Sequence, residues 1–237
     1  MNVVRNPVLR GDLRTRIRSR KILLIEAFFL SVLGLLAFLG LPPELNQVDP
    51  THQASLGVAL LIVQAVLFTY CASACALQEI GVEGEKAAVD LLFGAFAPGE
   101  IVAGKSLASL VTITYWLLLG APLVVLAAGI RQEAIGTLAV AAVLVVIEAW
   151  GITQVAMLYS IVIDAEVSRT LAHWATLLAI FVGTLAVPAS AQWVNPVVAV
   201  NRVAQGASPG PALALYAALG VVCDWASCRA LRRFTMA

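Results

Sequence analysis

The chain has 237 residues, of which 61% are apolar and only 12% are charged, and its formal net charge is +1. Soluble domains carry about 25% charged residues, so this composition excludes a water-soluble globular protein and indicates a membrane protein. The net charge gives no support for a nucleic-acid partner, and we expect none. The cations are unevenly placed, because seven of the fifteen Lys and Arg residues precede Ile22.

The first predicted element is an amphipathic helix over residues 5–21, RNPVLRGDLRTRIRSRK. Its apolar and cationic residues each repeat every four positions, as Leu9, Leu13 and Ile17 and as Arg10, Arg14 and Arg18. This pattern predicts an interfacial helix on the inner leaflet, with the guanidinium groups among phosphates of membrane lipids. Contact of the same helix with a protein partner is a second, compatible interpretation.

Six apolar stretches follow, and each reaches the roughly 20 residues that a spanning helix needs. They are Ile22–Leu41, Ser55–Leu77, Ser106–Ile130, Ala134–Ile163, Leu171–Ser190 and Pro211–Cys228. We therefore predict an all-α integral membrane protein that consists of one transmembrane domain. With the N-terminus inside, thirteen Lys and Arg residues are cytoplasmic and two, Arg131 and Arg202, are outside. This asymmetry predicts that both termini are cytoplasmic.

Between the second and third spans, residues of about 83–97 predict a short cytoplasmic helix. Acids at Glu83 and Glu85 suit a helix N-terminus, and Pro98 ends the segment. An apolar stripe follows the helical period at Val89, Leu92, Phe93 and Phe96. The stripe fits either lipid or the groove of a partner protein, and the acids favour the partner because they repel anionic lipid.

The stretch GEIVAGKS, Gly99 to Ser106, matches the P-loop pattern G-x-x-x-x-G-K-[ST]. A working P-loop lies between a strand and a helix within an aqueous domain. Here FGAFAP precedes Gly99, and Ser106 opens a predicted span. We therefore interpret the match as coincidental, with Lys105 reaching the level of the lipid phosphates.

The segment around this stretch resembles the permease subunits of type-2 ABC exporters. Their pattern between the second and third spans is similar to E-R-E-[KR]-G-T-x-[DE]-L-L-L-x-x-P-x-x-x-x-E-I-x-x-G-K. The matching residues are Glu83, Glu85, Lys86, Asp90, Leu91, Leu92, Glu100, Ile101, Gly104 and Lys105. The opening NPVLRGDLRTRIRSRK resembles the family's interfacial helix, and Asn195-Pro196 resembles its N-P pair. Ala87-Ala88 and Ala95-Phe96 depart from the usual Gly-Thr and Thr-Pro.

The resemblance implies that the helix of about 83–97 is a coupling helix, which seats in a cleft of a separate ATP-binding subunit. The implied contact residues are Glu83, Glu85, Lys86, Val89, Asp90, Leu92 and Phe93. It further implies a non-catalytic permease in the inner (plasma) membrane of a prokaryote. Its partners are two ATPase copies, which hold ATP and Mg, and a second permease copy or paralogue.

Polar residues inside the predicted spans raise separate questions. Glu148 lies near the middle of the fourth span, where an ionised carboxylate costs roughly 2.5 kcal/mol or more. It either lines the translocation path, where it binds a cation or a proton, or is a helix-packing residue. Asp224 lies near the cytoplasmic end of its span, where we expect an ion pair with Arg229. Cys71 and Cys75 share one helix face within the small-residue run CASAC, which favours packing over metal binding.

Three other functions compete with an ABC permease. A heme-exporter-type permease of cytochrome c maturation has six spans and a similar coupling loop. A secondary transporter is the next alternative, but the inverted repeats common in that class are not evident. An intramembrane hydrolase would need grouped acids and histidines, whereas His52 and His173 stand apart in the sequence.

Overall fold

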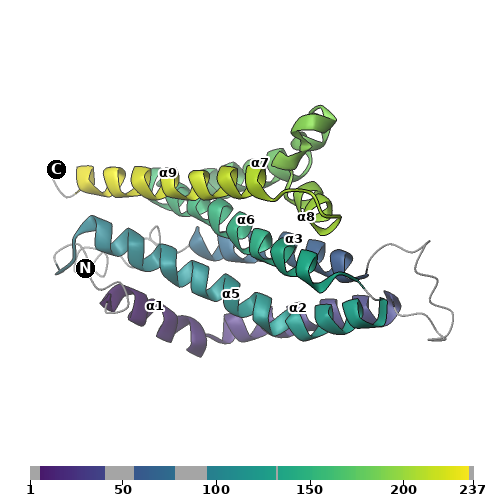
Figure 1. Cartoon of the computed structure of the whole chain (residues 1–237). Helices are drawn as coiled ribbons and strands as arrows, with labels where there is room; N and C mark the ends of the chain where they lie inside the picture. The colour runs from purple at the N-terminus through teal and green to yellow at the C-terminus, as the bar shows by residue number, and fades with distance from the viewer. Residues whose placement is uncertain (1–5, 41–55, 78–94, 132, 235–237) are drawn as a thin grey trace.

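A computed structural model of the chain describes residues 6–40, 56–77, 95–131 and 133–234, and in these ranges every regular element is a helix (Figure 1). The α-helices of these ranges are α1 (Pro7–Arg18), α2 (Arg20–Gly40), α3 (Leu56–Ala76), α5 (Pro98–Arg131), α6 (Ile135–Val162), α7 (Glu166–Phe181), α8 (Pro196–Ala204) and α9 (Gly210–Phe234). Two 3₁₀ turns, η4 (Gly183–Ala186) and η5 (Ala189–Val194), connect α7 to α8. The predicted all-α class is confirmed for these ranges.

Six segments are long and apolar enough to cross a membrane, as the sequence predicts. They are Ile22–Gly40, Leu56–Ala76, Pro98–Ile130, Ile135–Val162, Glu166–Ala186 and Gly210–Arg232. The helices that contain the third and fifth predicted spans start earlier than those spans, at Pro98 rather than Ser106 and at Glu166 rather than Leu171. In both cases polar residues that indicated a connection belong to the first turns of a helix.

Helix α6 lies at the centre of the bundle and packs most extensively against α9 and α3 (Figure 1). In α3 and α6, half of the residues in the most apolar 18-residue stretch are buried. In α2 and α7, only 17% of the corresponding residues are buried. The outer helices therefore present apolar side chains to their surroundings, for example Leu24 and Phe38 of α2. Lipid chains match such surfaces, so the exposure is consistent with a position in a bilayer.

Close approach of α6 and α9 depends on glycine. A Cβ at Gly151 of α6 would lie 2.5 Å from the carbonyl oxygen of Tyr216 of α9. A Cβ at Gly220 of α9 would likewise overlap the ring of Trp150 of α6. Small residues let membrane helices approach until their backbones touch, and they place these two axes close together here.

The segment after α7 turns back into the bundle and forms the short helix α8. Asn195 caps it, because its side-chain oxygen accepts from the Val198 N–H at 3.2 Å. The Asn195 amide also donates to the carbonyl of Phe181 and to Thr184 Oγ1, both at 2.9 Å. The buried face of α8 packs against α6 and α3.

Candidate functional site

The first turn of α5 is stabilised by its own cap. Pro98 is the first helical residue, a position where a missing N–H has no cost because first-turn N–H groups lack intrahelical partners. The Glu100 carboxylate accepts from the Ala97 N–H at 3.2 Å, as in a capping box. Helix α5 therefore contains the whole stretch from Gly99 to Ser106. A regular helix does not wrap its amides around a phosphate, which supports the interpretation that the P-loop match is coincidental.

Helix α1 is docked on this first part of α5. Asn6 caps α1 by accepting from the Val8 N–H at 2.9 Å, and its amide donates to the Glu100 carbonyl at 2.9 Å. Beside this bond, Val8 packs over Gly104, where an added Cβ would lie 2.9 Å from the Val8 Cβ. Asn6 is only 7% exposed, so α1 is seated against the protein and does not rest on lipid alone.

The cationic residues of α1 divide between two environments. Arg16 donates through Nε to Asp12 at 3.0 Å and through Nη2 to Ser109 of α5 at 3.5 Å. Arg10 and Arg14 are exposed, as the amphipathic pattern predicts, whereas the side chain of Arg18 lies outside the described residues. The helix therefore has one face on α5 and one cationic face that is available to lipid or a partner.

Three further helix ends meet near the α1–α5 contact. A buried apolar cluster joins the last turns of α3, α6 and α9 to the start of α5, through Ala76, Leu77, Val102, Met157, Ile161 and Leu231. In Figure 1 the end of α9 lies on the same side of the bundle as α1. The segment between α3 and α5 therefore begins and ends at this face.

A buried polar cluster of Ser106, Trp150, Gln154 and Asp224 lies just inside this face. Ser106 of α5 donates to Asp224 Oδ2 of α9 at 2.9 Å. With its amide nitrogen turned toward Asp224, Gln154 of α6 donates to Oδ1 at 2.9 Å. The Trp150 indole N–H of α6 lies 2.9 Å from the Gln154 oxygen and 3.1 Å from Ser106 Oγ. The cluster ties three helices together through hydrogen bonds.

The expected ion pair between Asp224 and Arg229 was wrong. Asp224 bonds to the cluster instead, and the Arg229 guanidinium lies 5.5 Å from the centroid of the Trp225 ring. The two residues are five positions apart on one helix, so their side chains leave it in different directions.

Glu148 of α6 is completely buried, and neither of its carboxylate oxygens has a hydrogen-bond partner among the described residues. Unpaired polar groups at such depth are uncommon in folded proteins. Tyr216 of α9 lies near it, but the Tyr216 hydroxyl donates to the Val194 carbonyl. The role of Glu148 in a translocation path therefore stays a prediction.

The cysteines of α3 and the histidine of α7 are the remaining candidate groups. Cys71 and Cys75 are half-buried thiols on α3. The described ranges hold no group of three His, Cys, Asp or Glu side chains that could bind a metal ion. His173 of α7 lies with Nε2 3.2 Å from Ser73 Oγ of α3.

The predicted contacts with an ATPase lie outside the described residues. Residues 78–94 are not described, and they include Glu83, Glu85, Lys86, Val89, Asp90, Leu92 and Phe93. Of the helix predicted at about 83–97, only residues 95–97 are described.

Sequence reasoning missed Asn6 as a docking residue. Its position before Pro7 was a usable signal, because Asn followed by Pro marks the start of a helix. Asn195 before Pro196 carries the same signal, which would have predicted α8.

The six spanning segments and the helical core define a multi-pass α-helical membrane protein. The chain matches neither a protein-family model nor a curated protein.

Proposed function

We propose that this chain is the transmembrane subunit of an ATP-driven exporter of the type-2 ABC class. It forms the translocation path, and a separate ATP-binding subunit binds and hydrolyses ATP with Mg. The contact of Asn6 with Glu100 carries this proposal, because it joins the two parts of the chain that resemble such permeases.

These two parts are far apart in the sequence. Asn6 begins the stretch that resembles the interfacial helix, whereas Glu100 and Gly104 belong to the E-I-x-x-G-K end of the coupling pattern. In the structure the Asn6 amide bonds to the Glu100 carbonyl, and Val8 packs over Gly104. A functional unit made of an interfacial helix and a coupling segment requires such a contact, so the geometry supports the resemblance.

The length of α5 supports a face that projects toward a partner. Its 34 residues extend over about 51 Å at 1.5 Å per residue, whereas the hydrocarbon core is about 30 Å thick. The asymmetry of Lys and Arg residues favours the α1 end as the cytoplasmic one. The first turns of α5 then project into the cytoplasm, directly after the predicted coupling helix.

The buried polar cluster connects the start of α5 to two other spans, so it can transmit a movement of the coupling helix to them. A coupling helix attached to α3 and α5 would shift α5 when the ATPase closes on ATP. Ser106 joins α5 to Asp224 of α9, and from α6 Gln154 bonds to Asp224 while Trp150 bonds to Ser106, so the shift reaches three spans. Two permease copies with two ATPase copies about a two-fold axis would complete the assembly.

Phe93→Ala tests the proposal. We expect Phe93 to be an apolar anchor in the ATPase cleft, and loss of such an anchor commonly costs about 2 kcal/mol. Co-purification of the ATP-binding subunit co-expressed with this chain should then fall by tenfold or more, since 1.4 kcal/mol is about one decade of affinity. Phe28→Ala is the matched control, because Phe28 is an exposed phenylalanine of α2. Purification of an active transporter without any ATPase would contradict the proposal.

A further inference from the structure

A polar cavity with a volume of about 390 Å³ lies at the end of the bundle opposite the α1–α5 contact. It is bordered by the first turns of α3 and α6, by the link between α5 and α6, and by the end of α8. Its apolar wall includes Val58, Ile62 and Leu138, and its polar residues are Glu133, Thr137, Asn201 and Gln205. Sites for small molecules typically have volumes of about 300–1,000 Å³, so the polar cavity is large enough for such a ligand.

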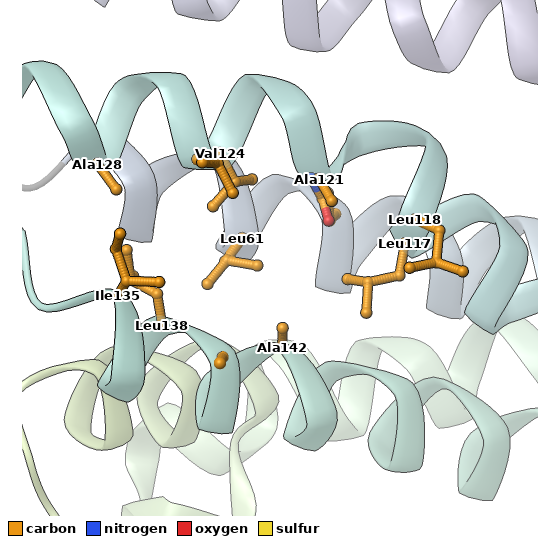
Figure 2. Close-up of a pocket in the computed structure, with 12 residues that line it drawn as sticks. Leu61, Leu117, Leu118, Ala121, Val124, Ala128, Ile135, Leu138 and Ala142 are labelled. Atoms are coloured by element: carbon orange, nitrogen blue, oxygen red, sulfur yellow. The ribbon is translucent and has the colours of Figure 1, made fainter.

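The surface of the polar cavity differs from that of its neighbour. Leu138 also borders a hollow of about 190 Å³ between α5 and α6, and Figure 2 shows Leu61, Val124 and Ala142 around that hollow. The hollow exposes only apolar surface, because Gln64 in its lining is completely buried. In the polar cavity, by contrast, Gln205 is exposed and the other three polar residues are partly exposed. Polar groups can therefore contact a ligand there.

The Glu133 carboxylate is held at the edge of the polar cavity by the start of α3. Its Oε1 accepts from the Gly57 N–H at 3.2 Å. Its Oε2 is buried and has no hydrogen-bond partner among the described residues. A Cβ at Gly57 would lie 2.4 Å from Oε2, so the carboxylate fits here because residue 57 is glycine. The carboxylate is thus fixed in place before a ligand binds.

The charge that lines the polar cavity is negative. Glu133 forms no ion pair within the described ranges, where Arg16 and Asp12 do form one, and Arg202 of α8 is not among the lining residues. The first turn of α3 contributes about half a positive charge, which offsets only about half of the carboxylate charge. A carboxylate can accept about four hydrogen bonds, and Glu133 accepts one, so Oε1 can accept more.

The neutral polar groups add acceptors beside this charge. Gln205 Nε2 donates to Asn201 Oδ1 at 3.3 Å, which leaves the Gln205 carbonyl oxygen as an acceptor. The Thr137 hydroxyl donates to the Ala134 carbonyl at 2.8 Å, so its lone pairs also remain. A divalent metal ion such as Ca²⁺ needs six to eight oxygen ligands, and the described residues hold no group of three acids for it. One carboxylate beside neutral acceptors and an apolar wall matches an organic cation better.

From these observations we infer that the polar cavity binds a small primary amine. Its ammonium group pairs with Glu133 Oε1, and its apolar part packs against Ile62 and Leu138. A primary ammonium has three N–H donors, so it can also bond to Thr137 and Gln205. Free amines and the headgroups of aminophospholipids both carry this group, and labelling in two lipid mixtures distinguishes these sources. The inference does not depend on the proposed export function.

Photolabelling of the full-length protein in lipid nanodiscs tests this site. The probe is a benzylamine with a trifluoromethyl-diazirine on its ring, and the comparison probe is the neutral benzyl alcohol of the same shape. In phosphatidylcholine and phosphatidylglycerol, which lack a primary amine, the amine should label the cavity residues of α3, α6 and α8. Unlabelled benzylamine should compete, and the alcohol should label them at least tenfold less. Added phosphatidylethanolamine lowers this labelling if a lipid amine occupies the cavity and leaves it unchanged if a free amine does.

Glu133→Gln separates binding from folding, because glutamine keeps an acceptor for the Gly57 N–H and removes the charge. It should lower amine labelling roughly tenfold to hundredfold, the value of a hydrogen bond to a charged group, and leave alcohol labelling unchanged. Its thermal unfolding should stay at the wild-type temperature. Glu166→Gln, at the exposed start of α7, is the matched control and should label like the wild type.

A second pair of variants tests the position of the site. Ala59→Phe fills the polar cavity and should remove labelling by both probes there. Val66→Phe, at an exposed position further along α3, should leave it unchanged. Equal labelling by the amine and the alcohol, or unchanged amine labelling in Glu133→Gln, would overturn the inference. Glu133 would then serve only to cap α3.

Discussion

The side-chain amide of Asn6 lies 2.9 Å from the carbonyl oxygen of Glu100, and this single bond joins the first turn of α1 to the first turn of α5. The same side chain caps α1 through the Val8 N–H. Because one residue performs both roles, the start of α1 and its position on the bundle are set together.

Asn6→Ala should therefore loosen α1. Loss of an N-cap costs about 1 kcal/mol, and loss of the bond to Glu100 about 1 kcal/mol more. Since 1.4 kcal/mol is one decade, opening of α1 should become roughly 30-fold more frequent. The measurement is the rate of tryptic cleavage at Arg10 and Arg14. Asn201→Ala, at an asparagine of α8, is the control, and an unchanged cleavage rate in Asn6→Ala would show that α1 is held by other contacts.

Asp224 and Arg229 should differ sharply when they are replaced. Asp224→Ala removes the bonds to Ser106 and Gln154 and should lower the free energy of unfolding by about 2–3 kcal/mol. Arg229→Ala removes only an exposed cation–π contact, worth about 0.5 kcal/mol. Unfolding of the detergent-solubilised protein by denaturant measures both. Equal losses would mean that the two residues form an ion pair after all.

Gly151→Ala should destabilise the pairing of α6 with α9. The added methyl group meets the Tyr216 backbone carbonyl at 2.5 Å, and overpacking against a rigid backbone costs about 2 kcal/mol. Gly136→Ala makes the same chemical change on the same helix, in open space, and should stabilise the protein by up to about 1 kcal/mol. Thermal unfolding followed by tryptophan fluorescence should therefore shift in opposite directions. A matching shift in both variants would contradict the close α6–α9 approach.

Glu148→Gln should fold like the wild type, because the amide has nearly the same shape and adds no buried charge. We expect it to change substrate-stimulated ATPase activity severalfold, since a carboxyl group that served only packing would have a hydrogen-bond partner, and Glu148 has none within the described ranges. Activity of the exporter proposed above, reconstituted with its ATPase, measures this. Glu166→Gln, at the exposed start of α7, is the control. Wild-type activity in Glu148→Gln would assign the residue to packing.

The sequence predicts the six spans well, because a bilayer requires long apolar helices whatever their neighbours are. The start of α5 was harder to predict. Pro98 and Gly99 were interpreted as the end of one helix, whereas Pro98 at the first position and Glu100 two residues later are also a start signal. The same residues fit either the end of one helix or the start of another. The contact with Asn6, which holds α1 against these residues, favours the start.

The partners of buried polar groups could not be predicted from local spacing. Asp224 was paired with Arg229 because the two are close in the sequence, but its observed partners come from α5 and α6. Gln64 has only apolar neighbours along the chain, and nothing in their order indicates that its amide nitrogen lies against Gly120 of α5. Such groupings arise when helices assemble, and helix periodicity does not record which faces will meet.

The connection between α5 and α6 bears on how the chain is made. Three residues separate Arg131, the last residue of α5, from Ile135, the first of α6. The two helices must therefore enter the bilayer during synthesis as one antiparallel hairpin. Insertion carries the short link across the hydrocarbon once, together with Arg131 before it and Glu133 within it, and each of these charges faces a barrier of about 3 kcal/mol at the bilayer centre. Transfer of the apolar residues of both helices into the bilayer releases more free energy than these barriers cost. Biogenesis of this pair therefore requires no large domain to be translocated.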